Sequence, residues 1–347
     1  MEKGEQYFQT EQLMSYAEFI NMALYDESFG YYMKNVPIGK KGDFYTSPTL
    51  SSVFADTIFS FFHHVVKKDG LPPVFCEIGS SKGDFARSFL QAVRKHSFDS
   101  LKYLSVEKSP LGGKEQQDLL RDAHFQFFSS IDDIPPFSGV VFSNEFFDAL
   151  PVHVLTRKSG KLFEVKLTSS KGTFKEVLVP LQNREIFEYL ESFPEFTIQE
   201  GQRVEIPLEM FREYGKITKK LRNGYIVTVD YGYTFEEMQE PALKEGSLRG
   251  YQNHRMKKSV LDRPGTMDIT YHIPFDALRK KGEESGFSTV QFVMQHEFLL
   301  QWGILQGLES YHGKDPFHPI LRRNRAIRML SSPNGISGYF RVLVQKK

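Results

Sequence analysis

Acidic side chains in this chain follow short apolar runs, at points where a ligand could reach them. Glu77 lies near the end of one such run, and Glu107, Glu145 and Asp230 each follow another. If the runs are parallel strands, their carboxyl ends share one edge of a sheet, which is where ligands bind in open α/β folds. Carboxylates there can hold an ammonium group, accept hydrogen bonds from ribose hydroxyls or grip a guanidinium. We therefore expect a ligand site at this edge.

The glycine spacing after the first run distinguishes between cofactors. A dinucleotide-binding turn has the pattern G-x-G-x-x-G, but the corresponding positions here are Gly79, Ser81 and Asp84. The pattern E-x-G-x-G-x-G fits better, with Glu77, Gly79 and Gly83 in place and Ser81 in the middle position. This turn suits a cationic adenosyl ligand without phosphate, because small residues let the backbone approach its amino-acid end. A nicotinamide dehydrogenase is therefore disfavoured.

The elements that must position these groups alternate between strand and helix. Apolar runs predict core strands at 74–79, 103–106, 125–128, 139–143 and 225–229, and a C-terminal strand at 338–344. Such alternation is typical of a parallel sheet with right-handed crossovers. We predict an α/β fold with a doubly wound, mostly parallel, Rossmann-like sheet. Glu107 then ends the second strand, where an acid can accept both hydroxyls of a ribose.

The remaining segments predict a helical cap and two insertions. Period-two alternation from 152 onward predicts an antiparallel β insertion at about 152–206. Residues 233–273 are rich in glycine, basic residues and turns, so we expect a second insertion that forms a lid. Helices are predicted at 11–25, 51–67, 114–123, 207–222 and 275–285. We expect residues 1–70 to form an N-terminal helical cap with a cofactor-covering loop, and residues 71–347 to form the core.

Composition excludes several classes of protein. Hydrophobic residues make up 40% and charged residues 25% of the 347 residues, which excludes a disordered chain. A net charge of +1 argues against nucleic acid and anionic lipid as partners. Cys76 is the single cysteine, which excludes a disulfide framework, and we expect no metal site. No run is apolar enough to span a membrane, and Met1–Thr10 lacks a signal-peptide pattern, so we expect a cytoplasmic protein.

Motifs along most of the chain resemble class I S-adenosylmethionine-dependent methyltransferases, and among them the MidA family, whose mitochondrial members are complex I assembly methyltransferases acting on protein arginine. Asn-Glu-x-x-Asp-Ala-x-Pro and Asp-Ile-Thr-x-His are the most specific motifs. The matching segments are Gly30–Tyr32, Gly42–Phe44, Thr46–Pro48, Glu77–Gly83, Val106–Glu107, Ser109–Pro110 with Gln116, Ser143–Pro151, Asp230–Gly232, Gly246–Arg249 with Tyr251 and His254, Pro264–Gly265, and Asp268–Thr270 with His272.

The resemblance implies a methyltransferase core, S-adenosyl-L-methionine as cofactor and a protein substrate, with arginine as the acceptor. It allows a homodimer. The expected site residues are Glu145, Asp148 and His272 for catalysis, Glu77, Gly79, Ser81, Gly83, Glu107 and Asn144 for the cofactor, and Asp268 and Tyr32 for the substrate. Glu145 is the first candidate to grip a guanidinium and Asp148 the second.

Departures from the family pattern leave an alternative open. Ser81 replaces the middle glycine, Gly112 and Gly113 stand where Leu-Arg is usual, and Pro274 replaces a polar residue. The chain could therefore be a degenerate methyltransferase that binds a partner as an assembly factor.

Structural roles also stay open for the single candidates at this stage. Glu77 and Glu107 could be solvated strand-end acids, and Asn144 could cap a turn. Asp148 could bond its own backbone, and His272 could be a loop histidine. The Arg322, Arg323, Arg325 and Arg328 cluster predicts a solvated helix face or a contact with an acidic partner.

Overall fold

The computed structural model describes residues 13–34, 52–98, 100–121, 124–170, 173–252 and 255–347. The predicted motif pieces at 42–48 and His254 lie outside these residues. Contacts divide the chain into two compact units. The sheet unit comprises Phe44–Phe146, Gly215–Tyr231 and Gly282–Lys347, and the insertion unit comprises Met1–Asp43, Phe147–Tyr214 and Gly232–Lys281. The boundaries expected from the sequence stay a prediction, because contact density does not test which segments fold independently.

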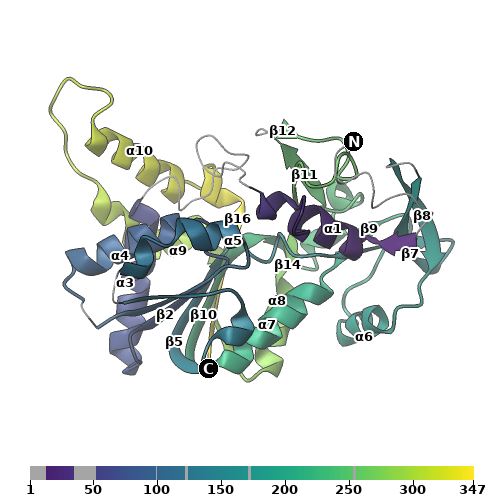
Figure 1. Ribbon diagram of the computed structural model, residues 1–347, viewed down its shortest axis with the longest axis horizontal. Helices are drawn as coiled ribbons and strands as arrows, with labels where there is room; N and C mark the ends of the chain where they lie inside the picture. The colour runs from purple at the N-terminus through teal and green to yellow at the C-terminus, as the bar shows by residue number, and fades with distance from the viewer. Residues whose placement is uncertain (1–12, 35–51, 99, 122–123, 171–172, 253–254) are drawn as a thin grey trace. The chain divides into compact units, whose positions relative to one another are not determined.

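The sheet unit is built on one twisted sheet (Figure 1). Its strands are β2 (Val74–Ile78), β3 (Lys102–Val106), β4 (Phe125–Phe128), β5 (Phe137–Asn144), β10 (Leu221–Tyr233), β15 (Ser288–Met294) and β16 (Phe340–Lys346), in the order β15-β16-β10-β5-β2-β3-β4. The strands from β10 to β4 are parallel, whereas β16 is antiparallel to both of its neighbours. The predicted Rossmann-like sheet is therefore confirmed. The strand order reverses between β2 and β5, which makes their carboxyl ends the switch point where ligands bind.

Aromatic side chains hold the helices against one face of this sheet. The helices of this unit include α3 (Ser52–Asp69), α4 (Asp84–Lys95), α5 (Pro110–Glu115), α9 (Gln295–Gln301) and α10 (Pro319–Ser331). Phe75 of β2 stacks on Phe89 of α4 with ring centroids 4.1 Å apart, and Phe142 of β5 stacks on Phe85 of α4 at 4.7 Å. These rings are fully or almost fully buried, and α3 lies against α4 (Figure 1). The many phenylalanines thus support the strands that end at the switch point.

The insertion unit contains the predicted antiparallel β segment and the second insertion. Strands β1 (Leu13–Ser15), β6 (His153–Lys158), β7 (Lys161–Ser170), β8 (Thr173–Pro180) and β9 (Arg203–Ile206) form one antiparallel sheet. Strands β11 (Arg249–Gln252), β12 (Arg255–Met256) and β13 (Asp268–Thr270) form a second one, and β14 (Ile273–Pro274) pairs with the end of β10. This unit contains the helices α1 (Tyr16–Tyr25) and α6 (Arg184–Ser192). Two more helices begin in it, α7 (Leu208–Lys220) and α8 (Phe275–Glu284).

Some helices begin or end at other residues than the sequence pattern predicted, because capping residues fix where a helix starts. The helix predicted over 114–123 instead begins at Pro110 and ends at Glu115, because Ser109 caps its N-terminus with Pro110 in the first turn. The helix expected over 11–25 begins at Tyr16, since Ser15 and Glu18 form a capping box there. The pattern alone missed α6, β9, β15 and α9.

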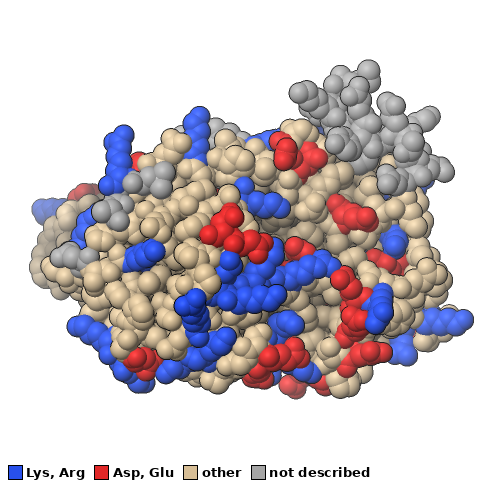
Figure 2. Space-filling model, turned by 60° about the horizontal axis from the view of Figure 1, so that its bottom comes forward, with Lys and Arg blue, Asp and Glu red and all other residues tan. Residues whose placement is uncertain are grey.

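The charged surface agrees with the near-neutral composition. Figure 2 shows Lys and Arg side chains near the middle of the face in view, with Asp and Glu side chains beside them. Among the described residues, no helix combines the length and the apolar character needed to cross a membrane.

The close pairing of β5 with β10 leads to a prediction about stability. Gly139 and Gly224 are paired in register, and a Cβ at Gly224 would overlap the carbonyl oxygen of Gly139. Gly224→Ala should lower the free energy of unfolding by about 2–4 kcal/mol, from overlap together with a backbone angle that disfavours alanine. Gly70→Ala is the matched control, because a Cβ there meets nothing within 4 Å and only the positive φ of 61° remains. Equal losses in urea unfolding of the two variants would contradict the overlap argument.

Candidate cofactor and active site

The loop between β2 and α4 has three residues with left-handed backbone. Gly79, Ser81 and Gly83 have φ values of 74°, 49° and 78°. Glycine adopts this region freely, whereas a residue with a Cβ does so at a cost of about 1–2 kcal/mol. The left-handed backbone therefore explains why the family pattern has glycine at the middle position. Ser81 adopts the same backbone conformation, but with conformational strain. The sequence indicated only crowding at this position.

The Glu107 carboxylate closes the other side of this loop. Its Oε2 accepts a hydrogen bond from the Ser81 N–H at 2.8 Å, and its Oε1 accepts one from the Ser109 N–H at 2.7 Å. Burial raises the pKa of Glu107, and the two N–H groups oppose that rise. Each carboxylate oxygen can accept a second hydrogen bond. Glu107 can therefore order the loop and still accept ribose hydroxyls, which extends the role expected from sequence.

Glu77 lies inside β2 on the aromatic face of the sheet. It is 5% exposed, and its Oε2 accepts a hydrogen bond from the Tyr103 hydroxyl at 2.5 Å. Burial raises the pKa of Glu77 to about 8, although the Tyr103 bond partly counteracts this effect. The structure therefore does not make it a solvated strand-end acid. Near neutral pH it is mostly protonated until a cation approaches.

Asn144 is the last residue of β5, which pairs with β2 at the switch point, and Glu145 follows it. Glu145 has a φ of 51°, and its N–H donates to the Val229 carbonyl at 2.9 Å. The Asn144 amide donates to Glu145 Oε1 at 3.0 Å, whereas the buried Asn144 Oδ1 has no hydrogen-bond partner among the residues that the structure describes. A strained non-glycine residue that follows a core strand is typical of a functional site. An unsatisfied buried oxygen beside it is suited to a donor from a ligand.

Three further expected residues meet in the insertion unit. The Tyr32 hydroxyl donates to Asp268 Oδ1 at 2.7 Å. Burial, with Asp268, Tyr25 and Asp148 next in effect, raises the pKa of Tyr32 well above its usual value. Asp148 and Asp268 are 3% and 7% exposed, and the rings of Tyr25 and Tyr32 lie 5.6 Å apart. The structure thus brings two carboxylates and two aromatic rings into one cluster.

His272 is also in the insertion unit, where Ser247 links it to Glu205, a residue that the sequence analysis did not single out. The His272 N–H donates to Ser247 Oγ at 3.0 Å, and the Ser247 hydroxyl donates to Glu205 Oε2 at 2.9 Å. Glu205 is buried in β9 and also accepts from the N–H groups of Ser247 and Leu248. Burial, and then Arg249, lowers the pKa of His272 to about 4. No sequence signal distinguished Glu205, because polar and apolar residues alternate along β9 as they do in any half-buried strand.

Comparison with known proteins assigns this chain to a family. A family model of S-adenosyl-L-methionine-dependent methyltransferases matches residues 53–293. The chain therefore belongs to this family of methyltransferases and uses S-adenosyl-L-methionine as its cofactor.

Relatives and solved structures agree with this family. The chain is 27% identical, over 78% of its length and 67% of the relative's, to a Drosophila melanogaster protein named protein arginine methyltransferase NDUFAF7 homolog, mitochondrial. It is 26% identical to the Homo sapiens NDUFAF7, over 83% of this chain and 69% of the relative. A crystal structure from Burkholderia thailandensis with bound S-adenosyl-homocysteine superposes with a TM-score of 0.86 at 24% identity, and the match covers 96% of this chain and 88% of that one. That likeness shows the shared fold.

The residues at the switch point fit the cofactor. Glu107 retains acceptor capacity for ribose, Asn144 Oδ1 is buried with no partner in the described part of the chain, and Glu77 is an acid next to a backbone turn. Gly112 matters here too, because a Cβ there would lie 2.6 Å from both Glu107 Cγ and the Ser81 carbonyl oxygen. The departure at Gly112 therefore leaves room for the loop that Ser81 shapes.

Ser81→Gly tests whether the serine is needed. We expect unchanged or tighter S-adenosylmethionine binding, because the change removes left-handed strain and leaves the Ser81 N–H contact to Glu107 in place. The free energy of unfolding should change by no more than about 1 kcal/mol, since the greater freedom of unfolded glycine offsets the relief. Calorimetric titration and urea unfolding measure both quantities. A clear loss of affinity would show that the serine hydroxyl makes a necessary hydrogen bond.

Glu77 predicts a pH-dependent cofactor affinity. Because its pKa is raised to about 8, Glu77 must lose a proton when it holds the cofactor's ammonium group at pH 7. Titrations in buffers of different ionisation enthalpy should show release of about one proton, and affinity should rise from pH 6 to pH 7.5. Glu77→Gln should remove this proton release and weaken binding. Proton release that persists in Glu77→Gln would assign it to another group.

Proposed function

We propose that this methyltransferase methylates arginine side chains of a protein substrate. The observation that carries the proposal is Glu145: a carboxylate on a strained backbone directly after β5, held by the Asn144 amide at the switch point of the methyltransferase sheet. The relatives named above are protein arginine methyltransferases, which supports the same acceptor.

For methyl transfer, the main task of the protein is to orient the reacting groups. When bound, S-adenosylmethionine supplies a methyl group activated by its sulfonium. The protein must align a nitrogen of the acceptor and exclude water, and orientation of this kind can contribute about 7–11 kcal/mol. A carboxylate that grips a guanidinium through two N–H groups draws its positive charge toward them, which leaves the third nitrogen more nucleophilic. Glu145 is the proposed residue for this grip.

Asp148 is the second candidate for contact with the acceptor. It lies in the cluster with Tyr32 and Asp268, where carboxylates and aromatic rings suit a planar cation. Asp268 and Tyr32 are proposed to bind the substrate there. The experiment below therefore separates Asp148 from Glu145.

His272 is proposed to orient a neighbouring group and not to act as a strong base. Its pKa of about 4 leaves it neutral near pH 7, so it holds a proton only weakly. Its ring lies 4.7 Å from that of Tyr233. The fixed Ser247–Glu205 support suits an orienting role.

A degenerate methyltransferase that only binds a partner is the second candidate function. Ser81 favours it, since a residue with a Cβ occupies a left-handed position of the cofactor loop. Methyl transfer decides between the two, because a partner-binding protein without catalysis would leave the extract described below unmethylated, whether or not it binds S-adenosylmethionine.

Location and assembly belong to the same proposal. We propose a cytoplasmic protein that forms no complex with nucleic acid or membranes and can form a homodimer. The relatives carry the word mitochondrial in their names, so cell fractionation is the direct test of location. Light scattering of the purified protein tests the dimer.

Glu145→Gln tests the acceptor grip. The amide keeps the side-chain shape but cannot neutralise a guanidinium. We expect S-adenosylmethionine affinity within about threefold of wild type and turnover lower by about 100-fold or more, since loss of one partner of a buried charged pair costs several kcal/mol. The acceptor is supplied by an extract of cells that lack the gene, with labelled methyl groups located on arginine by mass spectrometry.

Asp148→Asn is the comparison variant, measured for affinity and turnover on the same extract. If it loses more turnover than Glu145→Gln, the grip belongs to Asp148. Full turnover in both variants, or methyl groups found on another residue type, would overturn the arginine proposal.

A further inference from the structure

Gln116 is a polar residue with no exposed surface. It follows the last residue of α5, and its backbone N–H still donates to the Gly112 carbonyl at 3.1 Å. Its side chain is 0% exposed, although glutamine is usually found at the surface. A buried amide must have hydrogen-bond partners, because each unsatisfied group would cost free energy. The partners of Gln116 therefore show what its burial achieves.

The Gln116 amide bonds to the cofactor loop and to the neighbouring strand. Nε2 donates to the Ser81 carbonyl at 2.6 Å and to Ser80 Oγ at 2.9 Å, while Oε1 accepts from the Ser105 hydroxyl at 2.7 Å. Ser80 and Ser105 are themselves buried, with their hydroxyl oxygens 2.6 Å apart. One side chain therefore links the end of α5, the strand β3 and two successive loop residues.

This link fixes the peptide groups on both sides of the strained residue. The Ser81 N–H is held by Glu107, and the Ser81 carbonyl is held by Gln116. A Cβ at Gly83 would lie 2.8 Å from Gln116 Cγ, so the buried glutamine also accounts for glycine at that position. Protein side chains thus hold the left-handed loop on both sides of Ser81.

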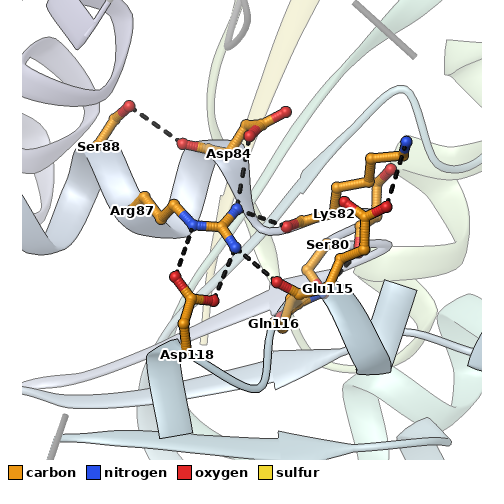
Figure 3. A network of polar contacts seen from close by, with 9 residues as sticks. Ser80, Lys82, Asp84, Arg87, Ser88, Glu115, Gln116 and Asp118 are labelled. Carbon is orange, nitrogen blue, oxygen red and sulfur yellow. Dashed lines mark hydrogen bonds and ion pairs between the residues drawn. The ribbon is translucent and has the colours of Figure 1, made fainter. Parts of the chain in front are cut away.

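A second residue braces the same segments at the surface. The Arg87 guanidinium donates to the Lys82 carbonyl at 2.7 Å, to the Glu115 carbonyl at 2.6 Å and to Asp118 Oδ1 at 2.8 Å (Figure 3). Arg87 is partly exposed, and its Asp118 partner is mostly exposed, so solvent screens this pair. Gln116 is buried, so solvent does not screen its hydrogen bonds in this way.

We propose that Gln116 is a positioning residue for S-adenosylmethionine. Its amide holds the Ser80–Ser81 backbone in the cofactor-binding shape before the cofactor arrives, so that binding need not order the loop. Preorganisation of this kind raises affinity by removing the ordering cost from the binding step.

Gln116→Met tests this role, because methionine has a similar volume and no amide. We expect S-adenosylmethionine and S-adenosylhomocysteine to bind about 10- to 100-fold more weakly, by the same factor, since both ligands need the loop. Hydrogen exchange of residues 79–83 should become faster in the free protein. Gln117→Met is the matched control, because Gln117 is the exposed next residue, and it should leave affinity and exchange unchanged. These measurements need no methyl acceptor, so they are independent of the arginine proposal.

Wild-type affinity in folded Gln116→Met would overturn the proposal. Lower thermal stability with unchanged affinity and exchange would also overturn it, since that result describes a residue that only supports the fold. If the methionine variant does not fold, Gln116→Glu gives the same test, because a carboxylate there faces the Ser81 carbonyl without a donor. Weaker binding of both ligands by that folded variant supports the proposal, and unchanged binding overturns it.

Discussion

The Ser81 peptide, held between Glu107 and Gln116, is the constraint on which the cofactor edge depends. Its N–H is bonded to the half-buried Glu107, which follows β3, and its carbonyl is bonded to the buried Gln116, which follows α5. The residue itself has a φ of 49°, which an isolated loop would rarely keep. The loop shape is therefore a property of three segments together. This explains how a serine can occupy a position where glycine is usual without loss of the turn.

Buried acids at this edge are stabilised by specific donors. Glu107 accepts hydrogen bonds from two backbone N–H groups, whereas Glu77 accepts one from the Tyr103 hydroxyl and has a pKa of about 8. Burial of a carboxylate favours its neutral form unless donors or cations compensate. A folded acid with a raised pKa binds a proton that the unfolded chain releases above about pH 4.5, so Glu77 lowers stability as pH rises from there to about 8. Such a cost is expected for a residue kept for binding.

Strain at the carboxyl edge recurs at a second strand. Ser81 follows β2 and Glu145 follows β5, the two strands on either side of the reversal in strand order, and both have left-handed backbone. The phenylalanine rings that pack beneath these strands are mostly buried, so they can hold both turns in place. The packing that stabilises the sheet thus also maintains strained residues at the site.

Strand periodicity and strand-end residues are local patterns, so the α/β class, the core strands and the acids that follow them could be predicted without the structure. Glu107 and the glycine loop could be assigned together for that reason, and the antiparallel insertion could be read from its alternation. The left-handed backbone of Ser81 and Glu145, the burial of Gln116 against the loop and the support of His272 by Glu205 through Ser247 became visible only in the folded chain. Apart from the strained backbone, these features depend on hydrogen-bond partners between 25 and 42 residues away. Long-range packing decides which polar groups are buried and which partner they meet, and no local pattern carries that information.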